Sequence, residues 1–222
     1  MKEEEIRPSK VFKKYLELCK EDIDEIFLNE KFHDFSCPAC DLQGELSFIK
    51  NHFTYKECHN CNTLFVSPRP SQEAFNNFYT KSKSAKYWAT DFYPLTAENR
   101  REKLWKPKVK KIKEIIDTYD LNDATLVDVG GGYGIFAEEI KNIGIKNIIV
   151  IEPSAELAGI CREKGLIVIE KFLENLDHSD LPDNQLFFLS FELFEHLHSP
   201  KTFLNSLYKV MKKNDYFFFT TL

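Results

Sequence analysis

Glycines and acids with the spacing of a nucleotide-binding turn occur between residues 126 and 153. The stretch Leu-Val-Asp-Val-Gly-Gly-Gly-Tyr-Gly begins at Leu126, and apolar residues at helical spacing follow it. A glycine turn between a strand and a helix lets the backbone come close to a ligand and adopt φ values that are closed to other residues. The candidate ligand contacts of this turn are Asp128, Gly130, Gly131, Gly132 and Gly134.

A second acid follows at the distance that ribose recognition requires. The apolar residues 147–151 form a second expected buried strand, and Glu152 and Pro153 stand at its end. A separation of about 20 residues from the glycine turn is typical of an acid that binds ribose hydroxyls. Ser154 then provides a natural N-cap for the next helix. We therefore add Glu152 and Pro153 to the expected cofactor contacts.

The dinucleotide fingerprint Gly-x-Gly-x-x-Gly fails at this turn in both registers. It places Ile135 at the third glycine when counted from Gly130, and Tyr133 at the second when counted from Gly131. The pattern Asp-x-Gly-x-Gly-x-Gly instead resembles the first motif of class I S-adenosylmethionine-dependent methyltransferases. An acid near the turn attracts the positive charges of a sulfonium and an ammonium, whereas it repels the negative charges of a pyrophosphate.

The resemblance also implies cofactor contacts after two later strands. An apolar or acidic pair after the third strand flanks the adenine ring in such enzymes, which indicates Phe172 and Leu173. Phe191 is the last residue of the fourth expected strand, 186–191, and Glu192 follows it. Ligands of open α/β sheets bind beyond the carboxyl ends of the strands, where these residues are expected to lie.

The segment after the fourth strand contains the candidate catalytic residues His196 and Glu195. An imidazole titrates near neutral pH, so His196 is the best candidate for a base that takes a proton from the acceptor. Packing behind the cofactor is an equally good role for it. Glu192, Glu195 and His196 also have the spacing of three divalent-cation ligands on one helical turn.

Two Cys-x-x-Cys pairs, separated by seventeen residues, form a second site. Cys37, Cys40, Cys58 and Cys61 match the spacing of a four-cysteine zinc site, and short strands at 46–49 and 53–56 predict a zinc ribbon. Four thiolates fill a tetrahedral shell, so this zinc is expected to be structural. A redox pair or an iron site is the alternative.

We expect four segments. Residues 1–36 form an amphipathic helical segment, 37–70 the zinc ribbon, 71–113 a linker or lid with a covering helix, and 114–222 the cofactor-binding domain. Residues 37 to about 79 resemble the zinc-bearing extension of some bacterial methyltransferases, several of which are similar to sugar methyltransferases or belong to surface-glycan pathways.

Alternating strands and helices from residue 126 predict an α/β fold with a doubly wound, mostly parallel, Rossmann-like sheet. The methyltransferase family that the chain resembles has a seven-stranded sheet, and this chain provides five strands. We therefore expect truncation after the fifth strand, residues 216–221, and doubt the activity of the chain alone. The exposed edge of that strand favours self-association or a partner.

The composition of the chain argues against two classes of protein, nucleic-acid binders and membrane-spanning proteins. The chain has 35 acidic and 30 basic residues, which argues against general nucleic-acid binding. No apolar run approaches the about 20 residues of a membrane span, and no signal peptide begins the chain, so a cytoplasmic protein is expected. The sequence favours methyl transfer from S-adenosylmethionine to a small molecule, a sugar or glycan precursor. The alternatives are a zinc-ribbon interaction protein with a vestigial domain, and an NAD-dependent oxidoreductase.

Overall fold

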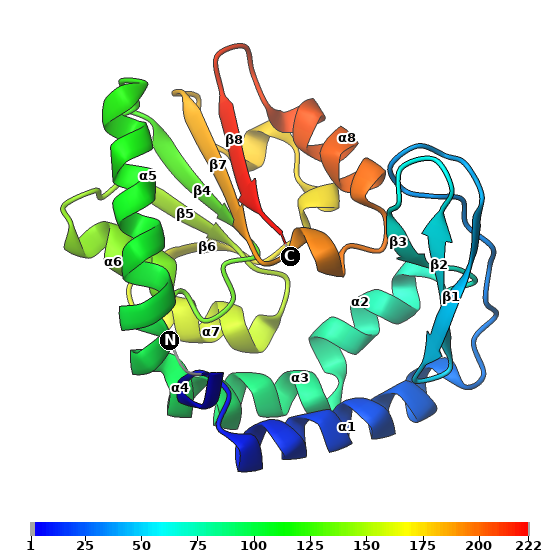
Figure 1. The fold of residues 1–222 in the computed structure, drawn as a ribbon. Coiled ribbons are helices and arrows are strands. Elements are labelled where there is room, and N and C mark those ends of the chain that lie inside the picture. The colour runs from blue at the N-terminus through cyan, green and yellow to red at the C-terminus, as the bar shows by residue number, and fades with distance from the viewer. Residues whose placement is uncertain (1–2, 222) are drawn as a thin grey trace.

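Five parallel strands form the main sheet in the computed structural model, which describes residues 3–221 (Figure 1). Their order is β6-β5-β4-β7-β8, so the strand order reverses between β4 and β7. The predicted doubly wound Rossmann-like sheet is confirmed, and this reversal is the place where such sheets bind ligands. The strands are β4 Thr125–Val129, β5 Ile148–Ile151, β6 Ile167–Ile169, β7 Leu186–Phe191 and β8 Tyr216–Thr220.

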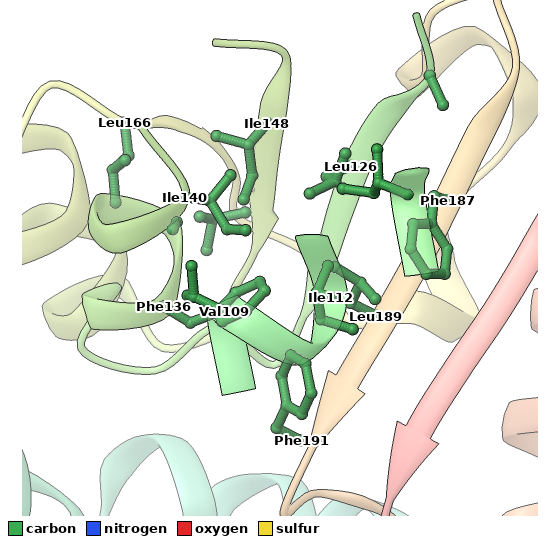
Figure 2. Close-up of a cluster of buried hydrophobic side chains, with 14 of the residues drawn as sticks. Val109, Ile112, Leu126, Phe136, Ile140, Ile148, Leu166, Phe187, Leu189 and Phe191 are labelled. Atoms are coloured by element: carbon green, nitrogen blue, oxygen red, sulfur yellow. The ribbon is translucent and has the colours of Figure 1, made fainter. Parts of the chain in front are cut away.

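Helices cover both faces of this sheet because the central strands are apolar on both sides. In β7, Phe187 and Leu189 join one buried cluster, whereas Leu186 and Phe188 join the other. Figure 2 shows the first cluster, in which α5 (Lys106–Thr118) and α6 (Ile135–Asn142) contribute side chains such as Ile112 and Phe136. α7 (Ala155–Glu163) joins the same cluster, and α8 (Pro200–Val210) covers the opposite face.

β8 lies at one edge of the sheet. Within residues 3–221 it pairs with β7 alone. None of its side chains is fully buried, and Phe219 is 40% exposed. The sequence predicted an exposed apolar edge at the fifth strand, and β8 forms such an edge.

The N-terminal part combines a long helix with a small antiparallel sheet. α1 (Ser9–Phe27) is followed by β1 (Gly44–Lys50), β2 (Phe53–Cys58) and β3 (Leu64–Val66), which pair in that order. Both strands predicted between the cysteine pairs are therefore present. Within residues 3–221, no helix combines the length and the apolar character needed to cross a membrane.

Residues 83–118 form one continuous helical run, which includes most of residues 71–113, expected as a linker or lid with a covering helix. The run contains α3 (Lys83–Tyr87), α4 (Tyr93–Arg100) and α5, joined by π-helical turns at 88–92 and 101–105. Its first turn is capped by the buried Asp22 of α1, whose carboxylate accepts from the backbone N–H groups of Lys83 and Ser84. A tertiary contact of this kind leaves no local sequence signal.

The small sheet packs beside α8 (Figure 1). The Nε2 atom of buried His198 lies 2.9 Å from the carbonyl oxygen of Pro70, and Lys201 of α8 forms an ion pair with Asp41. α2 (Gln72–Lys81), N-capped by Ser71, follows this contact and packs on α1. The N-terminal part is thus held against the loop that precedes α8.

Candidate active site

The glycine turn between β4 and α6 is tight on one side and open on the other. Gly130, Gly132 and Gly134 have φ values of 74°, 56° and 74°, in the left-handed region that favours glycine. A Cβ atom at Gly131 would lie 2.5 Å from Cγ1 of Val150, so that residue must also remain small. A Cβ atom at Gly132 would meet nothing within 4 Å. This open side gives a ligand access to the backbone of the turn.

Glu152 is fixed directly against the turn. Its side chain is buried, its Oε2 atom accepts from the backbone N–H of Gly132 at 2.9 Å, and its Oε1 atom accepts from that of Ser154 at 2.9 Å. Each carboxylate oxygen keeps further acceptor capacity. Glu152 can therefore organise the turn and accept hydroxyl protons from a ligand at once.

Asp128 is the second buried acid at this turn. It is 3% exposed, and its Oδ2 atom has no hydrogen-bond partner among the described residues. Burial, and then the charge of Glu152, raises the pKa of Asp128 to about 7. Burial also raises the pKa of Glu152 to about 7, against the opposing effect of the Ser154 and Gly132 N–H groups. Two buried acids disfavour a polyanion, and an unpartnered carboxylate oxygen fits a cofactor with cationic and hydroxyl donors.

An aromatic contact that the sequence did not reveal supports the turn. The ring of Tyr133 stacks on Tyr93 of α4, with ring centroids 4.9 Å apart and an interplanar angle of 21°. Lys164 donates to the carbonyl oxygen of Tyr133 at 2.6 Å, and its Nζ atom lies 3.9 Å from the centroid of that ring. The helical run and α7 therefore both hold the glycine turn. No spacing in the sequence connects these residues, which lie tens of positions apart.

The expected contacts after β6 and β7 differ in accessibility. Leu173 is 3% exposed in one core cluster, and buried Phe191 packs on Phe136 of the other with centroids 4.7 Å apart. Phe172 and Pro153 are half-buried. Of the pair expected beside an adenine ring, Phe172 is thus the residue with the more accessible side chain.

Glu192, Glu195 and His196 are all exposed, but each has a different partner. Glu192 accepts from Lys108 at 2.7 Å, Glu195 accepts from Thr221 at 3.2 Å, and His196 contacts the N-terminal part. Glu192 has a φ of 53°, and the three residues 194–196 form a 3₁₀ turn, so no α-helical turn aligns the three side chains. The structure does not assemble the three-ligand cation site that their spacing allowed.

The four cysteines form a separate cluster at the small sheet. Their Sγ atoms all lie within 4.8 Å of one another, with separations such as 3.4 Å between Cys40 and Cys58 and 3.6 Å between Cys37 and Cys61. Zinc–sulfur bonds of about 2.3 Å in a tetrahedron place the sulfurs about 3.8 Å apart. The Thr63 hydroxyl, 3.1 Å from the Cys61 thiol, lowers its pKa to about 6. Within residues 3–221, these four cysteines are the one group of three or more Cys, His, Asp or Glu side chains that lie close enough together to hold a metal ion.

Solved methyltransferase structures resemble this fold. The plantazolicin methyltransferase BamL, solved with a desmethylPZN analogue and SAH, is 14% identical, with a TM-score of 0.51 over 67% of this chain and 55% of that chain. The sugar N-methyltransferase KedS8 from Streptoalloteichus is 12% identical, with a TM-score of 0.48 over 59% of this chain and 53% of that chain. The chain spans between half and two thirds of the length of these proteins.

A family comparison covers the cofactor-binding part. No curated protein sequence matches the chain significantly. Residues 97–222 match the family of methyltransferase domains, which is more than half of the chain and includes the whole parallel sheet. The glycine turn, both buried acids and the reversal between β4 and β7 lie within the matched residues. The chain belongs to the methyltransferase-domain family.

Proposed function

We propose that the protein transfers a methyl group from S-adenosylmethionine to a small-molecule acceptor. The observation that carries this proposal is the acid-lined glycine turn, in which Glu152 is hydrogen-bonded to Gly132 and Asp128 keeps an unpartnered buried oxygen. This electrostatic arrangement fits a cationic nucleoside and opposes a diphosphate. The buried Ile135, at the position of the third fingerprint glycine, further disfavours a nicotinamide dinucleotide.

The residues of this chain have distinct roles in that transfer. When bound, the cofactor supplies an electrophilic methyl group on a sulfonium. Glu152 would accept hydrogen bonds from the ribose hydroxyls, Asp128 would attract the cationic end, and the half-buried Phe172 would contact the adenine ring. Most of the rate enhancement in such a transfer comes from aligning the two bound reactants. His196 takes the acceptor's proton where the acceptor atom must lose one.

The proposed acceptor is a sugar or a glycan precursor. The support for this class is the resemblance of residues 37 to about 79 to the zinc-bearing extension of some bacterial methyltransferases, several of which are similar to sugar methyltransferases or belong to surface-glycan pathways. We further propose that the four cysteines hold a structural zinc ion, since the four sulfur atoms leave no open coordination position. Incubating the protein with labelled S-adenosylmethionine and nucleotide-linked sugars, with short peptides as the comparison class, tests the acceptor.

Calorimetry with S-adenosylhomocysteine and with NADH tests the cofactor. We expect S-adenosylhomocysteine to bind and NADH to give no heat, because Asp128 at the turn opposes the diphosphate and Ile135 stands where the fingerprint needs its third glycine. Heat from NADH without heat from S-adenosylhomocysteine would overturn the proposed function. Binding of neither ligand would favour the vestigial-domain alternative.

Binding is expected to release protons at mildly acidic pH. The pKa values of Asp128 and Glu152 are both raised to about 7, so these acids are partly protonated at about pH 6.5 in the free protein. Hydroxyl and ammonium donors stabilise the charged carboxylates, so the ligand lowers both pKa values and its affinity rises as pH increases through about 7. Calorimetry with S-adenosylhomocysteine in buffers of different ionisation enthalpy should show proton release at about pH 6.5 and none at about pH 8.5. Equal proton counts at both pH values would contradict the carboxylate assignment.

A further inference from the structure

We infer that Tyr79 is a positioning residue that holds His196 in the tautomer with a free Nε2 atom. This inference rests on the proposed methyl transfer. It assigns to α2 of the N-terminal part a role in the chemistry at the carboxyl end of β7. The two residues are 117 positions apart, and no spacing in the sequence joins them.

The two side chains meet edge to face. The Oη atom of Tyr79 lies 3.3 Å from the Nδ1 atom of His196, and the rings are 6.0 Å apart at 72°. Both residues are exposed, so the imidazole is not enclosed by the protein core. The contact is therefore a specific one between a phenol and one ring nitrogen.

The position of His196 is tied to the glycine turn. Its backbone N–H donates to the carbonyl oxygen of Leu193 at 2.9 Å. The side chain of Leu193 covers Gly130, where a Cβ atom would lie 2.8 Å from Cδ2 of Leu193. His196 thus stands three residues after the leucine that packs on the proposed cofactor turn.

The position of Tyr79 is also fixed. Its ring packs on Phe75 and Phe78, with centroids 6.4 and 5.4 Å away, and both of these rings pack on Phe27 of α1. His198, two residues after His196, contacts the carbonyl oxygen of Pro70 immediately before α2. The loop after β7 and α2 are therefore connected at two points, which sets the separation of the phenol and the imidazole.

The tautomer determines what His196 can do. A neutral imidazole carries its proton on one nitrogen and accepts on the other. When Nδ1–H donates to the Tyr79 oxygen, Nε2 has the free lone pair. The acceptor's proton then moves to Nε2, the electron pair of the acceptor atom forms the bond to the methyl carbon, and the carbon–sulfur pair stays on sulfur. The hydrogen bond to Tyr79 persists and strengthens as the ring becomes charged.

No carboxylate performs this orienting role in the described structure. Glu195, the adjacent acid, accepts from Thr221, and Glu192 accepts from Lys108 and Thr220. Among the described residues, the side-chain partner of His196 Nδ1 is the Tyr79 hydroxyl. A phenol supplied by the N-terminal part thus contacts the ring nitrogen that a carboxylate contacts in a Ser-His-Asp triad.

Nitrogen NMR of the full chain, labelled with ¹⁵N-histidine, tests the inference without needing the acceptor. The His196 signals are assigned by their loss in His196→Gln, and spectra are recorded well above the ordinary imidazole pKa. We expect the Nδ1–H tautomer in the wild-type protein and a change to mainly Nε2–H in Tyr79→Phe. The matched control is Tyr208→Phe, which removes the hydroxyl of an 82% exposed tyrosine on α8 and should leave the His196 signals unchanged.

Two results would overturn the inference. One is a wild-type His196 that carries its proton on Nε2, a measurement that needs no substitution at Tyr79 and so survives misfolding of the variant. The other is an unchanged tautomer in a folded Tyr79→Phe protein. Calorimetry with S-adenosylhomocysteine separates this inference from the proposed function. If the protein binds S-adenosylhomocysteine but His196 carries its proton on Nε2, only the role of Tyr79 is ruled out. If the protein does not bind S-adenosylhomocysteine, the proposed methyl transfer is ruled out.

Discussion

Replacing Glu152 with alanine should raise the Kd for S-adenosylhomocysteine at least about 100-fold, because hydrogen bonds to a charged group contribute about 1.5–3 kcal/mol each and two ribose hydroxyls lose their acceptor. The substitution also leaves the backbone N–H groups of Gly132 and Ser154 without the carboxylate that they contact at 2.9 Å. Binding and organisation of the turn are therefore lost together. Calorimetry of the wild-type and variant proteins measures the effect.

One further variant separates charge from shape at this position, and a second one is the control. Glu152→Gln keeps one acceptor oxygen in nearly the same volume, so we expect an intermediate Kd. Glu156→Ala removes an exposed acid from the first turn of α7 and should bind like the wild type. Melting temperatures show whether each variant is folded. A folded Glu152→Ala protein with unchanged affinity would end the ribose assignment.

The parallel sheet was predictable because its signals are local. The apolar residues of β4 and β7 alternate between two clusters, and the glycines mark the turn where φ is positive. The Ser154 and Ser199 caps are also readable, since each serine accepts from a backbone N–H three residues later. Fold class and the place of the cofactor turn follow from such patterns.

The remaining site was not predictable because its contacts are between distant residues. The Tyr93–Tyr133 stack and the Tyr79–His196 pair join segments with no shared periodicity. Local spacing even misleads after β7: three potential ligands at helical spacing align only on a helix, and the φ of 53° at Glu192 prevents one. Periodicity also does not tell whether a residue after a strand faces the core, as buried Leu173 does.

Replacing Cys58 with serine should abolish zinc binding and unfold the small sheet. Cys58 is 1% exposed at the end of β2, and its sulfur is 3.4 Å from that of Cys40. Metal binding supplies on the order of 10 kcal/mol of folding free energy in zinc-finger peptides, more than a three-stranded sheet of this size gains from its apolar contacts. Metal analysis should find zinc in the wild-type protein and none in the variant, and limited proteolysis should cut the variant within residues 37–66.

The matched control is Cys19→Ser, which removes a thiol of α1 outside the cluster and should keep both zinc and protease resistance. A Cys58→Ser protein with wild-type zinc content, or a wild-type protein that contains iron, would contradict the structural zinc site.

The effect of losing zinc should extend beyond the small sheet. Asp41 lies within residues 37–66, so unfolding them removes its ion pair with Lys201 of α8, whereas the contact of Pro70 with His198 lies outside these residues.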